Sequence, residues 1–285
     1  MSVQEMESEE APDAMREVYD YTVGLIGLSG PTSDVCMELL GSGTLVRTKD
    51  CYGILTASHV LRSRAYGRSE HLGIPIVART AHRFSIPKSQ LSPIIIGSSE
   101  NEESGPDLAV LQLLNHKDVE EIEAHKSFWG LDAHRVAVLG TSRVPDSRLC
   151  ILAGCVGAWT QQRLPDNNFE NLKRFKAIFL DGIIEAPFTR EGFDYVDFPV
   201  DYKAGVYTGR DDIPSTFGGV SGGGLWRLTP KRDERGVTYG DDPVLIGVAF
   251  YETPVVDQKR TILCHYAASV YDCVLAALES GKTVQ

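Results

Sequence analysis

The sequence predicts an all-β protein of two closed antiparallel barrels or sandwiches with a helix at the C-terminus. Short runs rich in Val, Ile, Leu and Thr recur along the chain, and Gly, Pro, Ser or Asp bounds them, as is typical of strands joined by turns. The 285 residues include 27 glycines and 14 prolines, which suits many turns. The runs form two groups, and closing each group removes exposed sheet edges.

Each element follows from its local pattern. The first group of predicted strands is Tyr21–Leu28, Val35–Val46, Tyr52–Thr56, Leu72–Ala78, Leu91–Ile96 and Leu108–Leu113. Asp118–Ala124 has a helical composition and is predicted to link the two groups. The second group is Arg135–Leu139, Leu149–Trp159, Arg174–Ile184, Leu225–Leu228, Val244–Tyr251 and Thr261–Ala267. Ser269–Ser280 is predicted to be a helix, because Val270, Val274, Leu275 and Leu278 share one face.

We expect the chain to divide into three segments. Residues 1–18 are predicted to be an acidic, solvated tail or short helix. Residues 19–120 are expected to form the first barrel, and residues 121–285 the second barrel with the C-terminal helix. The two barrels together would make one domain, a size that a single chain of this length supports.

Composition and charge exclude several classes of function. The chain has 28 basic and 39 acidic residues, a net charge of −11, which argues against a general nucleic-acid binder. Its longest apolar runs fall short of the roughly 18 residues that a membrane span needs. The first ten residues are acidic and lack an apolar core, so they do not resemble a secretory signal. We therefore expect a cytoplasmic protein without a membrane or nucleic-acid partner.

The six cysteines are sparse and form no Cys-x-x-Cys pair. Cys150 and Cys155 are five residues apart in a predicted strand, so their side chains would point to opposite faces. We expect buried free thiols, with a disulfide or metal role as the alternative. No cofactor or metal is predicted.

Three segments carry residues typical of nucleophilic catalysis. The run from Gly53 to Leu61 places His59 in a turn just beyond a strand. Asp107 opens an alternating strand, and Ser221 lies inside the glycine-rich run Gly-Gly-Val-Ser-Gly-Gly-Gly.

Nucleophilic catalysis by serine requires a histidine and a carboxylate beside it. A serine hydroxyl becomes a good nucleophile when an imidazole takes its proton, and a buried carboxylate orients that imidazole. Glycines allow a tight turn, in which the amides of Gly219 and Ser221 would both face a developing oxyanion.

The serine segment also matches Gly-x-Ser-x-Gly, the nucleophile elbow of α/β-hydrolases. That elbow needs a helix after the serine, whereas the run that begins at Leu225 is predicted to be a strand that proline ends. It also needs an acid and then a histidine downstream, and His265 is the only later histidine. The order His59, Asp107, Ser221 is instead that of trypsin-like enzymes.

The sequence resembles the trypsin-like serine proteases of the chymotrypsin fold. Thr-Ala-Ser-His59 resembles that family's Thr-Ala-Ala-His, Asp107-Leu-Ala-Val-Leu resembles its aspartate strand, and Gly-Val-Ser221-Gly-Gly resembles its Gly-Asp-Ser-Gly-Gly. The likeness covers about residues 20–280, with 48 residues between His59 and Asp107 and 114 between Asp107 and Ser221. It implies two antiparallel six-stranded Greek-key β-barrels and a catalytic triad in a bacterial intracellular protease.

The resemblance also implies where substrate would bind. Phe250, Tyr251 and Glu252 match the strand end that lies along the substrate backbone, with an ordinary exposed strand end as the alternative. Tyr266 matches the tyrosine at the back of the primary specificity pocket, and Ser215 stands six residues before the nucleophile. Because Ser215 is not an aspartate, we do not expect selection of Arg or Lys.

Two departures from the family pattern bear on mechanism. Phe250 stands where the family often has a serine that supports the triad aspartate. Val220 stands where zymogen-type members carry the aspartate that pairs with a freed N-terminus, so no N-terminal processing is expected. The family's disulfide cysteines are also missing beside His59 and Ser221, as suits a reducing compartment.

The predicted function is that of a serine endopeptidase acting on protein or peptide substrates. The alternative is a catalytically inactive pseudoprotease that serves as a protein-binding module. A housekeeping role and a regulated stress or anti-phage role both stay open. Regulation would come from a protein partner or from a loop such as Ser98–Pro106.

Overall fold

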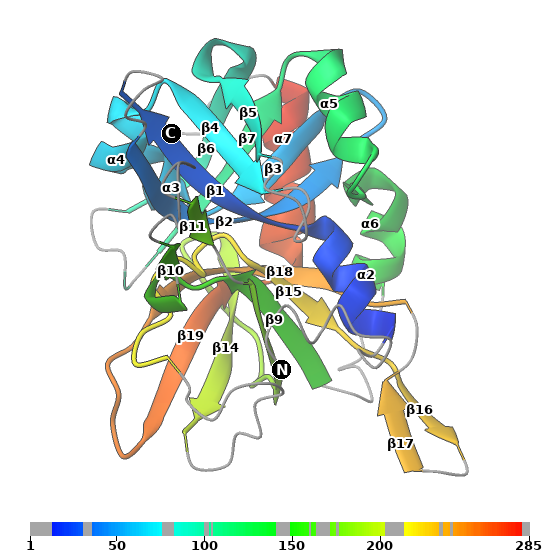
Figure 1. Ribbon diagram of the computed structural model, residues 1–285. Helices are drawn as coiled ribbons and strands as arrows, with labels where there is room; N and C mark the ends of the chain where they lie inside the picture. The colour runs from blue at the N-terminus through cyan, green and yellow to red at the C-terminus, as the bar shows by residue number, and fades with distance from the viewer. Residues whose placement is uncertain are drawn as a thin grey trace.

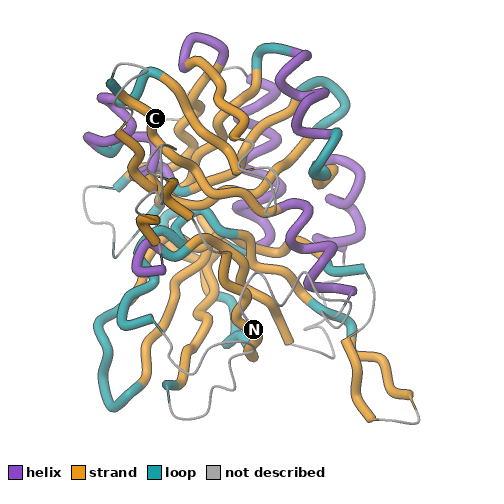
Figure 2. Tube along the Cα trace, in the orientation of Figure 1, coloured by secondary structure: helices purple, strands orange, loops and turns teal. Residues whose placement is uncertain are grey.

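The computed structural model describes most of the chain and consists mainly of strands (Figure 2). The described residues are 13–30, 36–75, 83–99, 103, 105–140, 149–159, 161–163, 172–174, 177–202, 214–233, 236–239 and 242–280. The strands belong to two large antiparallel sheets, which occupy the upper and lower halves of Figure 1.

The first sheet contains the strands up to residue 130. They are β1 (Thr22–Ser29), β2 (Cys36–Arg47), β3 (Tyr52–Thr56), β4 (His71–Pro75), β5 (Arg83–Pro87), β6 (Leu91–Ser98), β7 (Asp107–Leu113) and the short β8 (Trp129–Gly130). The strand order is β5-β4-β1-β2-β3-β7-β6, with β8 added parallel to β2. Neighbours in sequence are thus mostly neighbours in the sheet, as short turns require.

The second sheet is built from later strands in the order β12-β9-β15-β18-β19-β14-β13. Their bounds are β9 (Leu149–Cys155), β12 (Ala177–Ile183), β13 (Phe188–Arg190), β14 (Phe193–Asp201), β15 (Gly224–Arg227), β18 (Val244–Glu252) and β19 (Lys259–His265). Two small hairpins lie outside both sheets: β10 (Gln161–Arg163) with β11 (Leu172–Arg174), and β16 (Pro230–Asp233) with β17 (Gly236–Tyr239).

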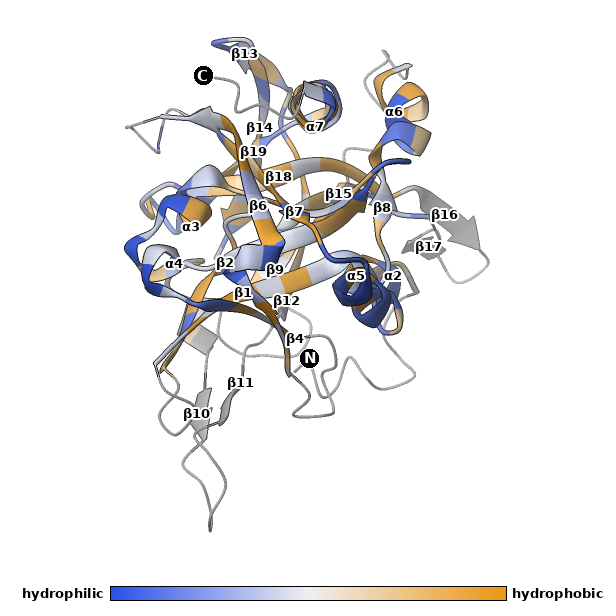
Figure 3. Ribbon diagram, turned by 90° about the horizontal axis from the view of Figure 1, so that it is seen from above, coloured by the Kyte–Doolittle hydropathy of each residue, from blue (hydrophilic) through white to orange (hydrophobic). Residues whose placement is uncertain are grey.

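Helices are short and lie around the sheets. They are α2 (Asp13–Tyr21), α3 (Ser58–Arg62), α4 (Arg64–Arg68), α5 (His116–Glu123), α6 (Leu131–Gly140) and α7 (Val274–Ser280), the last preceded by a π-helical turn at Ser269–Cys273. Within the described ranges, none of the helices has the length and apolar character needed to cross a bilayer. Apolar strands at the centre and more polar peripheral helices are visible in Figure 3.

Two apolar clusters form the core. One fills the first sheet and also takes in Tyr195 and Phe250 from the second sheet. The other fills the second sheet and takes in Val46, Leu55 and Leu108 from the first. Each core therefore includes side chains of both sheets, so the two sheets are packed as one unit.

The expected mostly β composition, the antiparallel sheets and the C-terminal helix are confirmed. Strand Tyr52–Thr56 has the expected bounds, and most other strands lie within a few residues of them. The strand expected at Arg135–Leu139 is wrong, because these residues belong to α6. Asp132 lies in the first turn of that helix, where a negative charge is favourable, and its carboxylate accepts hydrogen bonds from the backbone N–H groups of Lys49 and Ala133.

Residues 13–18, part of the segment predicted to be a solvated tail or short helix, belong to helix α2. Helix α2 buries Met15 and Val18 against the second core, and Figure 1 shows it beside the junction of the sheets. Tyr21, the last residue of α2, stacks on Trp226 with ring centroids 5.1 Å apart. This packing ties α2 to β15, the strand that follows the predicted nucleophile.

A buried lysine holds the C-terminal end of α2. The Lys126 ammonium donates to the carbonyl of Tyr19 at 2.7 Å and lies 3.4 Å from the centroid of the Tyr19 ring. Burial lowers the pKa of Lys126 to about 8, although the nearby Asp20 favours its charged form. A cation at this position also suits the negative end of the helix dipole.

Because α2 packs into the core, Met15→Ala should lower the free energy of unfolding by about 2–5 kcal/mol. Urea denaturation followed by tryptophan fluorescence measures this change. Lys117→Ala, at an exposed position of helix α5, is the control and should stay within about 0.5 kcal/mol. Equal effects of the two substitutions would show that α2 does not pack as described.

Candidate active site

His59 and Asp107 meet at the edge of the first sheet. Strand β3 ends at Thr56, and the one-turn helix α3 then turns His59 back toward the start of β7, where Asp107 lies. His59 Nδ1 is 2.5 Å from Asp107 Oδ2. The Asp107 side chain is 1% exposed and the His59 side chain 23%, so solvent reaches the histidine but not the carboxylate.

The Asp107 carboxylate is bound by three groups of α3. Besides the His59 ring, the His59 backbone N–H donates to Oδ1 at 2.8 Å and the Ser58 hydroxyl donates to Oδ1 at 2.5 Å. Burial opposes the charged form, but the hydrogen bonds from His59 and Ser58 and the charge of the His59 ring hold the pKa of Asp107 below its ordinary value. Asp107 is therefore ionised at neutral pH.

Ser221 lies in a tight turn between the buried Val220 and strand β15. The Gly223 N–H donates to the Val220 carbonyl at 2.7 Å, and the Gly222 N–H donates to the Ala249 carbonyl at 2.7 Å. Gly222 has φ +90°, and a Cβ there would lie 2.0 Å from the Ser42 carbonyl oxygen, so the turn requires glycine.

Ser42, on β2 of the first sheet, is bonded to this turn. Its N–H donates to the Ser221 carbonyl at 2.8 Å, and its hydroxyl donates to the Gly219 carbonyl at 2.6 Å. The same hydroxyl accepts the Cys155 N–H at 2.7 Å, and the Ser42 carbonyl accepts the Thr56 hydroxyl at 2.8 Å. A single buried serine therefore connects β2, β3, β9 and the Ser221 turn.

The Ser221 turn lies next to α3. A Cβ built on Gly41 would be 2.6 Å from Val60 Cγ2 and 2.9 Å from the Ser221 carbonyl oxygen. Val60, the residue after His59, and the backbone of Ser221 therefore both lie against Gly41 of β2. The structure brings His59, Asp107 and Ser221 into one region.

Hydrogen bonds to their carbonyl oxygens fix the orientation of the peptide groups that precede Gly219 and Ser221. The Gly218 carbonyl accepts the Gly157 N–H at 2.7 Å, just as the Val220 carbonyl accepts that of Gly223. In a trans peptide the C=O and N–H bonds point in opposite directions. The N–H groups of Gly219 and Ser221 therefore point away from these internal partners.

The other predicted site residues divide into two sets. Phe250 is the bulged residue between Ala249 and Tyr251 on β18, and its carbonyl accepts the Ser221 hydroxyl at 3.4 Å. Tyr251 and Glu252 follow it as half-buried residues at the strand end. In contrast, Ser215 is exposed, and no contact between it and Ser221 is seen.

Glu252 binds the segment before the nucleophile. Its carboxylate accepts the Thr216 hydroxyl at 2.5 Å and the Phe217 N–H at 2.7 Å, and it forms an ion pair with Arg260. Tyr266 is half-buried, and its N–H donates to the Asp194 carbonyl at 2.9 Å.

All six cysteines are free thiols. Cys150, Cys155 and Cys264 are buried as expected, whereas Cys36 is exposed. Burial raises the pKa of Cys155 to about 11 and that of Cys150 to about 12, so both are protonated at neutral pH. In the described parts of the chain, no three His, Cys, Asp or Glu side chains gather as metal ligands would.

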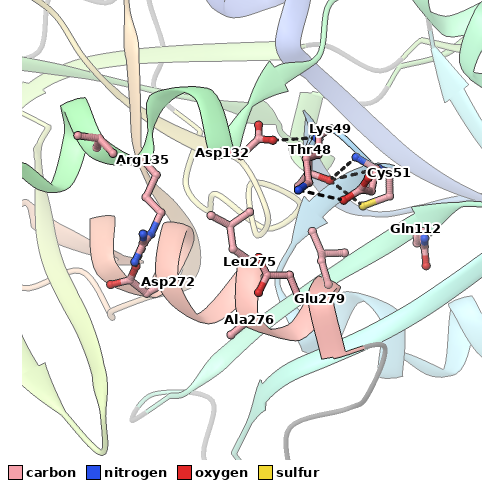
Figure 4. Close-up of a pocket in the computed structure, with 13 residues that line it drawn as sticks. Thr48, Lys49, Cys51, Gln112, Asp132, Arg135, Asp272, Leu275, Ala276 and Glu279 are labelled. Atoms are coloured by element: carbon pink, nitrogen blue, oxygen red, sulfur yellow. Dashed lines mark hydrogen bonds and ion pairs between the residues drawn. The ribbon is translucent and has the colours of Figure 1, made fainter.

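A pocket of about 560 Å³ lies elsewhere, between α6, α7 and the turn from β2 to β3 (Figure 4). Two of its charged side chains, Arg135 and Asp272, form an ion pair at 2.7 Å, and the Asp132 carboxylate accepts the backbone N–H of Lys49. It contains none of the predicted site residues.

Sequence reasoning missed two residues of the site. Ser58 donates to Asp107, and its one signal in the sequence was its place directly before His59. Ser42 gave no signal, because its role depends on contacts with residues more than 100 positions away. The loop Ser98–Pro106, predicted as a switch, lies partly outside the described residues.

Ser42→Ala should lower the free energy of unfolding by about 1–3 kcal/mol, because it leaves the buried Cys155 N–H without an acceptor. Urea denaturation measures the loss. Ser85→Ala removes an exposed hydroxyl of the same sheet and is the control. A Ser42 variant as stable as this control would contradict the described contacts.

Comparisons with known proteins identify no family. No protein-family model matches the chain, and no curated protein matches it. What can be said of its function therefore comes from the residues and contacts described above.

Proposed function

We propose that this chain is a serine endopeptidase and that its two sheets, of eight and seven strands, correspond to the two barrels that the chymotrypsin fold builds from six strands each. Ser221 attacks the scissile carbonyl, His59 takes and returns the proton, and Asp107 orients His59. The amides of Gly219 and Ser221 stabilise the oxyanion. The observation that carries the proposal is the 2.5 Å contact of His59 Nδ1 with a buried carboxylate beside the Ser221 turn.

The protonation of the pair supports a base at His59. An ionised carboxylate can only accept hydrogen bonds, so Nδ1 of His59 donates to Asp107. In the neutral ring the lone pair then lies on Nε2, the atom that accepts a proton from serine in such triads. Asp107 also stabilises the imidazolium that forms when His59 takes this proton.

The backbone around Ser221 supports an oxyanion site. The N–H groups of Gly219 and Ser221 lie opposite carbonyls that are already hydrogen-bonded, so neither peptide needs to turn to donate. Ser42 holds the Gly219 carbonyl in place. Val220 is 2% exposed, and its Cγ1 would lie 3.2 Å from a Cβ at Gly154 on β9. These contacts stabilise the turn without a freed α-amino group.

The end of β18 supports a substrate-binding role for Phe250, Tyr251 and Glu252. A substrate strand could lie along these residues, because the bulge at Phe250 directs the strand end past Ser221. Cleavage of a protein or peptide chain, rather than of a small ester, follows from such an extended site. In a pseudoprotease the same strand end would bind peptide without cleaving it.

Ser221→Ala and His59→Ala should each lower turnover by about 10⁴–10⁶, because the members of a triad act as a unit. Hydrolysis of a peptide library, quantified by mass spectrometry, measures this loss. Ser85→Ala and His116→Ala change exposed residues of the same types and should keep wild-type turnover. More than about a tenth of wild-type turnover in either triad variant would refute the assignment.

Activity should rise with pH through a midpoint near about 6.5–7, because His59 must be neutral to accept the serine proton. Asp107 does not titrate in this window, since its pKa lies below the ordinary carboxyl value. A series of kcat/KM values between pH 5 and pH 9 gives the midpoint. A flat profile over this range would contradict a histidine base.

Cleavage after Arg or Lys should not dominate. Ser215 offers no carboxylate, and the charge of Glu252 is already paired with Arg260. Asp211 and Asp212, the nearest other acids in sequence, lie outside the described residues. Cleavage-site profiling of a denatured proteome, with Ser221→Ala as the blank, measures the preference. A profile in which Arg and Lys fill most positions before the cut would overturn this prediction.

A further inference from the structure

A second histidine lies directly behind Asp107. His265 ends strand β19 of the second sheet and is fully buried. Its Nε2 accepts the backbone N–H of Asp107 at 3.0 Å. Its ring lies among three aromatic rings, with centroids 4.8 Å from Phe250, 5.0 Å from Tyr195 and 5.6 Å from Phe193.

The ring is neutral, and its tautomer follows from the contact. Burial lowers the pKa of His265 to about 3, and Asp107 opposes this shift while Arg190 adds to it. Since Nε2 accepts a hydrogen bond, the ring proton lies on Nδ1. Within the described residues, buried Nδ1 has no hydrogen-bond partner. A buried N–H without a hydrogen-bond partner lowers the stability of the fold. The hydrogen bond between Nε2 and the Asp107 N–H offsets part of this loss of stability.

This contact joins the two sheets at the catalytic carboxylate. Asp107 belongs to β7 of the first sheet, whereas His265 pairs with Tyr195 on β14 and with Val248 on β18 of the second. Tyr195 also lies against the turn before Asp107, since a Cβ at Gly105 would be 3.0 Å from its ring. The backbone of Asp107 is thus held by the same sheet that carries Ser221.

We propose that His265 is a positioning residue: its neutral ring holds the Asp107 backbone against the second sheet and so aligns the carboxylate with His59 and Ser221. Its catalytic consequence rests on the proposed function. A charged His265 would carry protons on both nitrogens and lose the acceptor that Asp107 needs. The role therefore requires a histidine kept neutral by its surroundings.

The titratable and charged groups around this unit come from every element packed against it. Helix α3 contributes His59, and β7 contributes Asp107. Strand β13 contributes Arg190, whose guanidinium carbon lies 4.9 Å from the centroid of the Tyr195 ring of β14. Strand β14 contributes the titratable Tyr195, whose ring centroid lies 5.0 Å from that of His265, and Phe250 of β18 contributes no titratable group. Asp107 is the one of these groups that binds both histidines. A displacement of Asp107 would therefore change the hydrogen bond and the charge that the His59 ring experiences.

The test compares three variants of the full chain by kcat/KM and its pH profile. His265→Phe fills the space but accepts no hydrogen bond, and kcat/KM should fall by about 10- to 100-fold. The midpoint of its acid limb should move down by about half a pH unit or more, because a displaced Asp107 stabilises the His59 imidazolium less. His265→Gln supplies a carbonyl oxygen as acceptor and should restore kcat/KM to within about threefold of wild type. His116→Phe makes the same substitution at an exposed histidine on α5 and should leave both values unchanged.

Wild-type kcat/KM and midpoint in a folded His265→Phe variant would overturn the proposal. A loss that neither shifts the midpoint nor recovers in His265→Gln would show a purely structural role and overturn it equally. Should His265→Phe fail to fold, ¹⁵N spectra of the wild-type ring decide: we expect a proton on Nδ1 and no titration between pH 5 and pH 9. The opposite tautomer or a charged ring would refute the proposal. A wild type that hydrolyses no peptide would instead refute the proposed function, and the spectra would still report on the contact.

Discussion

The buried carboxylate of Asp107 sets the requirements for the structure around it. An isolated charge in the interior is costly, and it is tolerated when hydrogen bonds and an opposite charge compensate it. Helix α3 meets this requirement with the ring and backbone of His59 and the hydroxyl of Ser58. The short turn after β3 thus has a physical reason: it brings three donors to one carboxylate.

The Ser221 turn meets a second requirement, because its tight backbone is held without a covalent link. The six cysteines are free thiols, and the buried Val220 is uncharged. Ser42 holds the turn by neutral hydrogen bonds to the Ser221 and Gly219 carbonyls. A turn held in this way needs no oxidation to form.

Local pattern predicted the strands whose side chains alternate or are buried throughout, such as β3 and β7. It failed at α6, where Arg135–Leu139 looks like a strand although these residues continue a helix that begins at Leu131 and carries Asp132 in its first turn. It also missed β14, which contains Pro199; that residue lies beyond the part of the strand that pairs with β13, where an edge tolerates proline. The triad candidates were visible as motifs, and Ser58 stands next to one of them, but the roles of Ser42 and His265 were not visible, because they depend on contacts with residues more than 100 positions away.

The central claim is that Ser221 is an activated nucleophile, and a covalent probe tests it most directly. Wild-type protein would be treated with a fluorophosphonate, weighed intact by mass spectrometry and then mapped by peptide analysis. The account predicts one adduct per chain, located on Ser221 and lost when His59→Ala is treated in the same way. A folded protein that acquires no adduct, or carries it on another serine, would contradict the account.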